Sequence, residues 1–400
     1  MTKTTTPQPE ITVGIDIGDK HCQLCFLDAK GEVIEESRIR TVEVALRERF
    51  DGRLPMLVVI EAGTHSPWIS RLLGELGHKV LVANPRKLRL ISNSNTKNDR
   101  NDAETLARAG RFDPTLLAPI EHRTEASQKD LEAVHARDQV VRMRTGLINH
   151  VRGVLKSIGS ALPSGETNKF HEVVRKNVPE PLLASIEPLI SVIQQTTEAI
   201  NRYDKMVDEL VATEYKETTR LTQVNGVGNL TGLAFMLSLG DPHRFKKSRD
   251  VGPYLGMQPR QDSSGKSTPE LSITKAGDGF LRRLLVGSAN YILGPFGKDS
   301  DLRRWGLQKA EGGKNAKKRA VVGVARKLSV LVHHLWVSGE IYEPLRNTAQ
   351  SPTGKEAEVS APAVAPSPVQ PAKRPAQKAV TTMVPMTKLT RQTTIEATPR

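Results

Sequence analysis

Between Ile11 and Pro119, short apolar segments alternate with helical patterns, and this alternation restricts the fold more than any other feature of the chain. ITVGIDIG is rich in β-branched residues, and HCQLCFLD and VIEESRIR lie on either side of a turn at residues 29–32. MLVVIEAG and KVLVANP are short and continuously apolar, which is typical of buried parallel strands. Helical patterns occupy VEVALRERF, SPWISRLLGELG and NDRNDAETLARAGR. We therefore expect a β-hairpin followed by βαβ units, in a mixed α/β sheet of about five strands.

A long helical stretch follows, from about Glu121 to Thr219. Apolar residues recur every seven positions at Val134, Val141, Ile148 and Leu155. A second stripe runs through Ile186, Ile190, Ile193, Ile200, Tyr203, Val207 and Leu210. Residues 159–165 interrupt the pattern with Gly and Pro, so we expect two long helices that fold back on each other as an antiparallel coiled-coil arm.

The rest of the chain divides by composition. Residues 220–345 are helical in pattern and Gly-rich, with clustered Arg and Lys, whereas residues 346–400 consist largely of Ala, Pro, Thr, Ser, Lys and Gln. Such a tail cannot bury a core, and we expect it to be disordered, as we do for the polar residues 1–10. The predicted organisation is an α/β domain at 11–120, a helical arm at 121–219 and an all-α domain at 220–345.

The charge of the chain favours a polyanionic partner. Its 58 Lys and Arg residues exceed its 44 Asp and Glu residues, giving a formal charge of +14. Nucleic acid is the simplest partner for such an excess. Only two cysteines are present, which fits a reducing cytosol, and no apolar run approaches the ~20 residues of a membrane span. We therefore expect a cytoplasmic protein with no membrane partner.

Four acidic residues lie where they could act together. Asp16 is in the middle of an apolar strand, and Glu61 ends another, where α/β sheets often place functional groups. Asp99 and Asp102 are three positions apart and share one helix face. If the four converge, their mutual repulsion raises their pKa values and a divalent cation relieves it. Oxygen ligands of this kind suit Mg²⁺ or Mn²⁺, and two such ions can support phosphodiester cleavage.

Each acid also has a structural interpretation. Asp99 and Asp102 could form a solvated helix face, and Glu61 could cap the helix that follows it. Asp16 is harder to explain in this way, because its neighbours Ile15 and Ile17 indicate burial. The order of strand Asp, strand Glu and helical Asp-x-x-Asp after a hairpin is more specific than any one of its members.

That order resembles the RuvC/RNase H-like nuclease fold. The segments VGIDIGDKHCQLCFLD, VVIEAGTHSPWISRLL, KVLVANPRKLRLI and KNDRNDAETLARAGR are similar to successive blocks of the DEDD transposases, the insertion-sequence recombinases of the "IS-one-ten" family. The resemblance implies that Asp16, Glu61, Asp99 and Asp102 form the metal-binding catalytic set. Actin-like kinases also begin with a strand like GIDIG, but they need a second Gly-rich phosphate loop, which we do not find in the first 130 residues.

The C-terminal half contains two candidate DNA-binding elements. Gly226 and Gly228 flank Val227 between two helical runs, which suggests a helix-hairpin-helix that contacts phosphates, although a plain turn explains it equally well. Further on, Ser263, Ser264 and Gly265 form a turn-prone loop. The basic residues around this loop in the sequence are Arg260, Lys266, Lys275, Arg282 and Arg283. A serine among cations could attack a phosphate, but from the residues alone a flexible Ser/Gly loop is the simpler interpretation.

The same family resemblance favours a catalytic role for this loop over a merely flexible one. LGMQPRQDSSGKS and ITKAGDGFLRRLL are similar to the C-terminal domain of these transposases, where a Ser before Gly is the nucleophile that becomes linked to DNA. The spacing implies Ser264 in this role, with the adjacent Ser263 as the alternative. The resemblance also implies a homo-oligomer, a dimer or tetramer with composite sites, acting on donor and target DNA with a structured non-coding guide RNA.

The sequence therefore predicts an RNA-guided DNA transposase or recombinase. Two alternatives stay open: a metal-dependent nuclease of the Holliday-junction type, and a non-catalytic scaffold that binds RNA and DNA. Cys22 and Cys25 form a C-x-x-C pair, but no second ligand pair for zinc follows, and alternation along a strand puts the two thiols on opposite faces. A basic run from Lys314 to Lys327 could be either a solvated helix face or a phosphate-binding helix.

Overall fold

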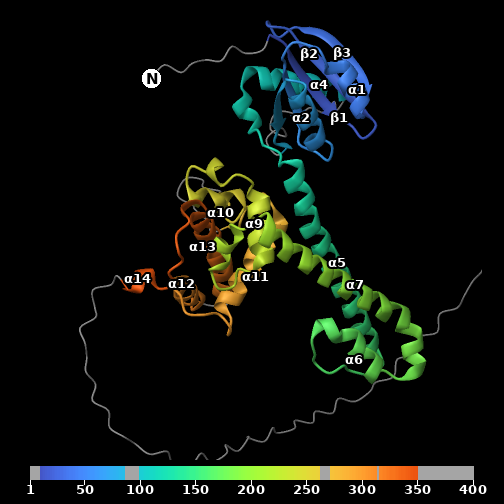
Figure 1. The fold of residues 1–400 in the computed structure, drawn as a ribbon, viewed down its shortest axis with the longest axis vertical. Helices are drawn as coiled ribbons and strands as arrows, with labels where there is room; N and C mark the ends of the chain where they lie inside the picture. Colours follow the sequence, from blue (N-terminus) through green and yellow to red (C-terminus); the bar gives the residue numbers. More distant parts are fainter. Residues whose placement is uncertain (1–9, 86–98, 262–270, 313–314, 350–400) are drawn as a thin grey trace, which may run out of the picture. The chain divides into compact units, whose positions relative to one another are not determined.

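The computed structural model describes residues 10–85, 99–261, 271–312 and 315–349 (Figure 1). Its N-terminal part is a five-stranded sheet in the order β3-β2-β1-β4-β5. The strands are β1 (Thr12–Ile17), β2 (His21–Leu27), β3 (Val33–Arg40), β4 (Leu57–Glu61) and β5 (Lys79–Ala83). β1 pairs antiparallel with β2 and parallel with β4, and β4 pairs parallel with β5. The prediction of a mixed sheet that begins with a hairpin is confirmed.

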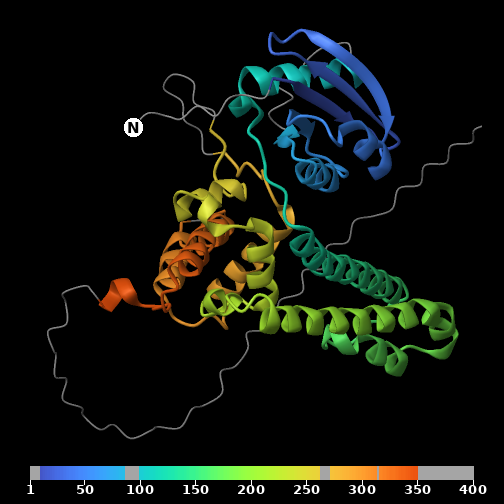
Figure 2. The same cartoon turned by 45° about the horizontal axis from the view of Figure 1, so that its top comes forward.

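Helices cover both faces of this sheet (Figures 1 and 2). One face packs against α1 (Glu43–Phe50) and α2 (Ser66–Glu75), and its core contains Val13, Ile15, Leu24, Leu46 and Ile69. The other face packs against α4 (Asp99–Phe112), followed by a 3₁₀ turn at Pro114–Leu117. Alternate residues of each strand therefore point to different helices.

The middle of the chain forms an arm of two long helices, α5 (Glu125–Ser157) and α7 (Glu180–Thr213), which lie side by side (Figure 2). The short helix α6 (Phe170–Asn177), preceded by a 3₁₀ turn at Thr167–Lys169, packs with them. Val134, Ile148 and Leu155 of the predicted seven-residue repeat are buried. The expectation of two long helices that fold back on each other is confirmed.

The arm contains one buried cation. Arg144 lies between Val141 and Ile148 on the inner side of α5 and is 8% exposed. Its Nη1 donates hydrogen bonds to Asn168 Oδ1 at 2.9 Å and to Thr197 Oγ1 at 3.3 Å. Its Nε has no hydrogen-bond partner among the described residues, and burial lowers the pKa of the guanidinium. A polar layer therefore interrupts the aliphatic core of the arm.

The C-terminal part is helical around a single large core. Its helices are α8 (Thr218–Thr222), α9 (Asn229–Leu239), α10 (Val251–Tyr254), α11 (Gly279–Leu293), α12 (Asp301–Ala310), α13 (Ala316–Ser338) and α14 (Arg346–Ala349), with 3₁₀ turns at Pro242–Arg244 and Ser248–Asp250. The short helix α14 lies inside the tail predicted from residue 346, and Asn347 N donates to Asp301 Oδ2 at 2.8 Å. This part is mostly helical, as predicted, with one short β-bridge between Pro259 and Ile273.

In the described part of the chain, α13 is the one helix long and apolar enough to cross a membrane. Half of its apolar stretch is buried inside the protein. Val324, Leu328, Val332 and Trp336 pack into the same core as α9 and α11. These contacts account for the apolar composition of α13, because a central helix must be apolar on several sides.

Candidate active site

Asp16 and Glu61 lie on the face of the sheet that packs against α4. Gly14 touches α4 so closely that an added Cβ would lie 1.9 Å from the carbonyl oxygen of Ala103. Val59 packs with Leu106 of the same helix. Because residues two apart on a strand share a face, Asp16 follows Gly14 and Glu61 follows Val59 on the α4 side. The parallel pairing of β1 with β4 places the two acids at neighbouring strand ends.

Asp99 and Asp102 lie in the first turn of α4, directly before Ala103. A second glycine brings this helix close to the sheet, since an added Cβ on Gly110 would lie 2.4 Å from Val59 Cγ2. Acids in a first helical turn are also favoured by the helix dipole, which gives both residues a structural reason to be there. The close packing of α4 nevertheless brings the Asp-x-x-Asp pair to the face that carries Asp16.

The electrostatics of Asp16 connect all four acids. The pKa of its carboxyl is raised to about 6, first by burial and then by the negative charges of Asp99, Asp102 and Glu61. Asp16, Asp99 and Asp102 take part in no ion pair within the residues that the structure describes. Each of the three other acids is therefore close enough to Asp16 to act on its charge, and among the described residues no Arg or Lys forms an ion pair with Asp16.

The acids do not form a closed metal cage in this structure. Across residues 10–85, 99–261, 271–312 and 315–349, no group of three or more His, Cys, Asp or Glu side chains is close enough together to hold a metal ion. Carboxylate oxygens are suitable ligands for a divalent cation, but in this structure the four side chains are not arranged around one point. The residue chemistry fits such an ion, and the assignment of the four acids as ligands stays a prediction.

Ion pairs and hydrogen bonds fix α4 to the hairpin of β2 and β3. Arg100 pairs with Glu36 on β3. Arg108 Nη1 donates to the carbonyl of Gly31 at 3.0 Å, and Arg111 donates to the carbonyl of Ala29. These contacts hold the helix across the sheet at several points, so that the position of its first turn relative to β1 is well determined.

Two polar side chains adjoin this face: Gln23, which the sequence did not predict, and His65, which was expected either to touch substrate or to cap the helix after Glu61. Gln23 pairs with Asp16 across β1 and β2 and is half-buried on the α4 side. His65 follows Glu61 at the start of α2, and its Nε2 lies 3.3 Å from Asp19 Oδ1 while its Nδ1 accepts from Trp68 Nε1 at 3.1 Å. Strand alternation from Cys25 could have identified Gln23, whereas the contact of His65 with Asp19 depends on two loops that are far apart in sequence.

The cysteines lie as expected. Cys22 packs with Val13 and Ile15 on one face of the sheet, and Cys25 packs with Ala103 on the other. Both thiols are free and buried, and burial raises the pKa of each. The two sulfurs are on opposite sides of β2, so they cannot ligate the same ion.

The second candidate site is approached by a short two-stranded ribbon. Arg260 N donates to Ser272 O at 3.0 Å, Thr274 N to Gln258 O at 2.9 Å and Lys275 N to Gly256 O at 3.0 Å. These bonds hold together the two ends of the segment between Gln261 and Leu271. Ser263, Ser264 and Lys266 lie in that segment, outside the described residues.

Close backbone contacts and one arginine lock the base of this ribbon. An added Cβ on Gly256 would lie 2.1 Å from Ala276 O, and one on Gly277 would lie 2.2 Å from Tyr254 O. Arg282 Nη1 donates to Leu255 O at 2.8 Å and to Ala276 O at 3.0 Å. Arg282 therefore joins the two chain segments that lead to and from the serine loop.

The other basic residues predicted near the serine loop differ in their surroundings. Lys275 has a left-handed backbone with a φ of 55°. Arg283 pairs with Asp138 of α5, with 2.8 Å between Nη2 and Oδ2, and lies over the ring of Phe280. Arg260 is exposed at the end of the ribbon. The nucleic-acid roles predicted for these residues stay predictions.

Both candidate sites fall within segments that match known families. A DEDD transposase family of the IS110 type matches residues 13–159, and the family described as "Transposase IS116/IS110/IS902 family" matches residues 218–295. The transposase for insertion sequence element IS1111A of Coxiella burnetii is 30% identical over 349 residues, covering 82% of this chain and 90% of the relative. The chain belongs to the IS110 family of transposases. It is thus an enzyme of DNA cleavage and recombination, and the family resemblance drawn from its motifs is confirmed.

Other relatives carry similar names. This IS110-family transposase is 30% identical to a probable family 20 transposase of Pseudomonas aeruginosa, over 73% of this chain and 87% of the relative. It is 29% identical to the transposase for insertion sequence element IS1328 of Yersinia enterocolitica, over 71% of this chain and 85% of the relative. The substrate class of the transposase is therefore DNA.

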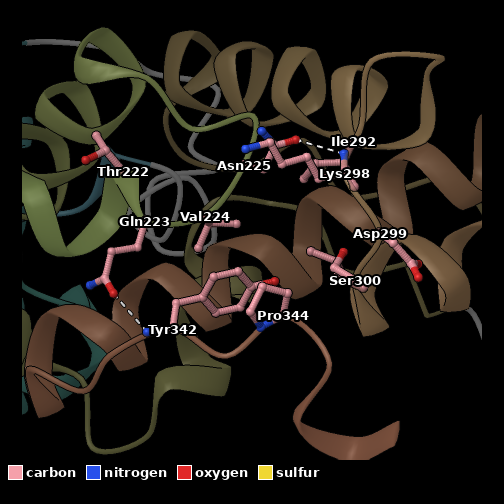
Figure 3. A pocket seen from close by; sticks show the side chains of 11 residues that line it. Thr222, Gln223, Val224, Asn225, Ile292, Lys298, Asp299, Ser300, Tyr342 and Pro344 are labelled. Carbon is pink, nitrogen blue, oxygen red and sulfur yellow. Dashed lines mark hydrogen bonds between the residues drawn. The ribbon is translucent and has the colours of Figure 1, made fainter.

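The predicted glycine hairpin of the transposase connects α8 with α9. Gly226 has a φ of 95°, a conformation that favours glycine, and Gly228 precedes the first residue of α9. Asn225 Oδ1 accepts a hydrogen bond from Lys298 N at 3.1 Å, beside a cavity of about 310 Å³ (Figure 3). A glycine turn between two helices is present, and the predicted helix-hairpin-helix contact with DNA stays a prediction.

Proposed function

We propose that this transposase cuts and rejoins DNA strands with a divalent-metal carboxylate site and a serine nucleophile. The carboxylates are Asp16, Glu61, Asp99 and Asp102, and the nucleophile is Ser264. The observation that carries the proposal is the meeting of β1, β4 and the first turn of α4, where burial and then the charges of the three other acids raise the pKa of Asp16. The proposal includes a RuvC-like domain at 11–120, a coiled-coil arm at 121–219 and a C-terminal transposase domain at 220–345.

The carboxylates would hold Mg²⁺ or Mn²⁺, in keeping with the general use of divalent metal by DEDD transposases. Such an ion supplies positive charge to phosphate oxygens when it is bound. The contribution of the chain is the placement of the acids: Asp16 and Glu61 are fixed on paired strands, and Asp99 and Asp102 are fixed by the packing of α4. The side chains must move closer together on binding the cation, because they form no cage without it.

The serine step follows from its chemistry. The Oγ of Ser264 attacks a DNA phosphorus, a serine–phosphate bond forms, and the bond from phosphorus to the leaving sugar oxygen breaks. The serine proton passes to a base, and a proton reaches the leaving oxygen. Because one phosphate ester bond replaces another, the covalent intermediate can be rejoined to a DNA end without a further energy source. The locked ribbon base supports this role, because it fixes both ends of the segment that carries the serine.

The nucleophile is tested by trapping a covalent protein–DNA adduct on denaturing gels. The full chain with DNA carrying its element ends, and with Mg²⁺, should form the adduct, Ser264→Ala should abolish it, and Ser263→Ala should keep it. Cleavage that requires Mg²⁺ but survives Ser264→Ala would indicate a nuclease of the Holliday-junction type instead. Binding without any product in wild-type protein would indicate a scaffold.

The proposed metal site has a readout that is independent of activity. Mg²⁺ or Mn²⁺ should raise the melting temperature of the wild-type protein, since a ligand that binds only the folded state stabilises it. Asp16→Asn should remove this response, whereas Asp51→Asn, at an exposed position after α1, should keep it. An equal shift in wild type and Asp16→Asn would contradict the assignment of Asp16 as a ligand.

The proposed assembly is a dimer or tetramer in which one chain supplies the carboxylates and another the serine. Neither Asp102→Asn nor Ser264→Ala should form the adduct alone. A mixture of the two variants should regain it if the sites are shared between chains. A mixture that stays inactive, while wild-type protein mixed with either variant stays active, would show that each chain supplies both parts.

The proposed guide is a structured RNA encoded next to the reading frame. The formal charge of +14 supports binding of both RNA and DNA, but it does not distinguish them. RNA that copurifies with the full chain should map to the non-coding end of its element, and adding that RNA should direct adduct formation to DNA complementary to it. Adduct formation at the same DNA sites without RNA would rule out guidance.

A further inference from the structure

A strongly basic segment between α9 and α10 has no role in the proposal above. Residues 243–249 contain five basic side chains: His243, Arg244, Lys246, Lys247 and Arg249. In the described part of the chain, none of the five forms an ion pair. Two acids flank the segment, and Asp241 accepts a hydrogen bond from the backbone of His243 at 2.8 Å. The four Arg and Lys side chains are cations with no acidic partner among the described residues, which favours a ligand with negative charge.

Aromatic rings lie among these cations. The guanidinium of Arg244 is 4.6 Å from the ring centre of Tyr254 and 4.8 Å from that of Phe245. The two rings meet edge to face at 5.3 Å, and Phe245 also packs against His333 at 5.4 Å. Tyr254 is 40% exposed, whereas Phe245 packs against the main helical core. Phe245 is therefore a fixed support, and Tyr254 offers a ring surface on which a flat group can stack.

Tyr254 and Arg244 line an open cavity of about 740 Å³. This volume is within the range of roughly 300–1,000 Å³ typical of pockets for small organic ligands. Other lining residues include Arg123, Ser127, Tyr215, Met236 and Trp336, together with the two acids Glu121 and Asp241. Arg123 is held at the end of α9, where its Nε donates to Leu237 O at 2.5 Å and its Nη2 to Ser238 O at 2.9 Å. The cavity thus combines aromatic walls with two arginines, as a site for a base and its phosphate requires.

The cavity lies at the base of the ribbon that leads to the serine loop. Tyr254 ends α10 and directly precedes the first ribbon segment, and its carbonyl oxygen would be 2.2 Å from a Cβ added to Gly277 in the second segment. Tyr254 therefore belongs both to the wall of the cavity and to the base of the ribbon.

We propose that this cavity binds one unpaired base of a DNA strand, stacked on Tyr254, with Arg244 at its phosphate. The guanidinium of Arg244 lies over this ring, 4.6 Å from its centre, so on binding it must move from the ring to the phosphate as the base takes its place. Unpaired RNA bases share this chemistry, and DNA is the assigned ligand because the transposase acts on DNA. The inference depends on DNA as the substrate of the proposed function, but on neither Ser264 nor the metal.

Fluorescence of an unpaired 2-aminopurine tests the inference. The full chain should quench a single unpaired 2-aminopurine in an otherwise paired DNA duplex, because stacking on an aromatic ring quenches it. Tyr254→Leu should weaken binding of this duplex by about tenfold, as expected for the loss of one stacked base. It should leave binding of the fully paired duplex unchanged. Tyr254→Phe should bind as wild type does.

A second pair of variants separates stacking from charge. Arg244→Gln should weaken binding of both duplexes and reduce the slope of log affinity against log salt by about 1. Tyr291→Leu is the matched control, because Tyr291 is 44% exposed on α11 and does not line the cavity. It should change neither the quenching nor the affinity.

Several outcomes would overturn the inference. Wild-type affinity in Tyr254→Leu, or equal quenching in Tyr254→Leu and wild type, would remove the stacking site. Tighter binding of an unpaired base in RNA than in DNA would remove the assigned ligand. If Tyr254→Leu melts early, Tyr254→Trp provides the test, and a Trp variant without quenching would count against the site. Binding is measured without Mg²⁺, so failure of the serine or metal proposal leaves these results interpretable.

Discussion

The sheet face that carries Asp16 and Glu61 (the carboxylate face) and the two-stranded ribbon that leads to and from the serine loop both contain close backbone contacts. The two regions are constrained in different ways. At the carboxylate face, two strands and a helix fix the positions of the acids. Their negative charge is not neutralised there, and the pKa of Asp16 is raised. At the ribbon, backbone hydrogen bonds and Arg282 fix the two ends of a connecting segment. The first site should therefore respond to pH and cations, and the second to changes in geometry.

The largest effect is expected where α4 touches β1. In Gly14→Ala, the new methyl group would lie 1.9 Å from Ala103 O and 2.6 Å from Ala107 N, so the helix must move away from the sheet. We expect a loss of about 3 kcal/mol in the free energy of unfolding, measured by urea denaturation, because backbone atoms cannot yield as a side chain can.

A glycine with free space gives the matched control. Gly74 lies in α2 with no atom within 4 Å of an added Cβ, so Gly74→Ala should stabilise the protein by roughly 0.5–1 kcal/mol. If Gly14→Ala were as stable as Gly74→Ala, the close packing of α4 on β1 would be wrong, and with it the placement of the Asp-x-x-Asp pair.

The second effect concerns the base of the ribbon. Arg282→Lys keeps the charge but cannot reach both carbonyl oxygens in the same way, and we expect a loss of about 1–2 kcal/mol in unfolding free energy. Adduct formation should slow at all Mg²⁺ concentrations, since the change affects position and not charge. Arg283→Lys alters an exposed ion pair and should cost less than about 1 kcal/mol. Equal effects of the two substitutions would show that Arg282 has no special structural role.

The third effect separates stability from activity at the carboxylate face. Asp16→Asn should abolish adduct formation but raise the unfolding free energy at pH 7 by about 1 kcal/mol, after allowance for the partial exposure of the side chain. The reason is the raised pKa: a carboxyl that titrates near pH 6 when folded and near 3.8 otherwise is destabilised as an anion in the folded state.

The sign of this effect sets its pH dependence. The cost of ionised Asp16 is fully present above about pH 6 and disappears as the pH falls through 6 towards 3.8, where both states hold the proton. The stability advantage of Asp16→Asn should therefore shrink between pH 7 and pH 4, as measured by urea denaturation. An advantage independent of pH would show that burial of the charge is not its cause.

The smallest effect tests whether a buried charge outside both sites matters for stability. Arg144→Met removes a desolvated cation from the arm and fills a similar volume, and the change should be neutral or stabilising by up to about 1 kcal/mol in thermal melting. A loss of several kcal/mol would show that its bonds to Asn168 and Thr197 outweigh the cost of burial.

Much of the fold could be predicted from the sequence because its patterns are local. The alternation in HCQLCFLD and the continuous apolar run in MLVVIEAG each predict a strand without knowledge of their partners. The strand positions of Asp16 and Glu61 followed in the same way. Both acids also share a sheet face with Gly14, against α4. This could not be predicted, because it depends on packing between segments far apart in the chain.

The basic residues show more clearly what cannot be predicted from the sequence. Arg282 and Arg283 are adjacent and equally cationic in the sequence, but one donates to two ribbon carbonyls and the other pairs with Asp138. Arg144 reads as a surface residue of an amphipathic helix, although it is buried. Charge and spacing cannot separate these cases, because a guanidinium reaches partners that only the tertiary fold brings near.

The buried guanidinium of the arm also limits how its two long helices can slide. Aliphatic ridges fit one another almost equally well after a shift of one turn, but such a shift would take Arg144 away from Thr197 and leave its charge against hydrocarbon. Only one alignment satisfies both the apolar stripe and the polar layer. The arm therefore has a single length, and every copy of the chain holds its two ends at the same spacing.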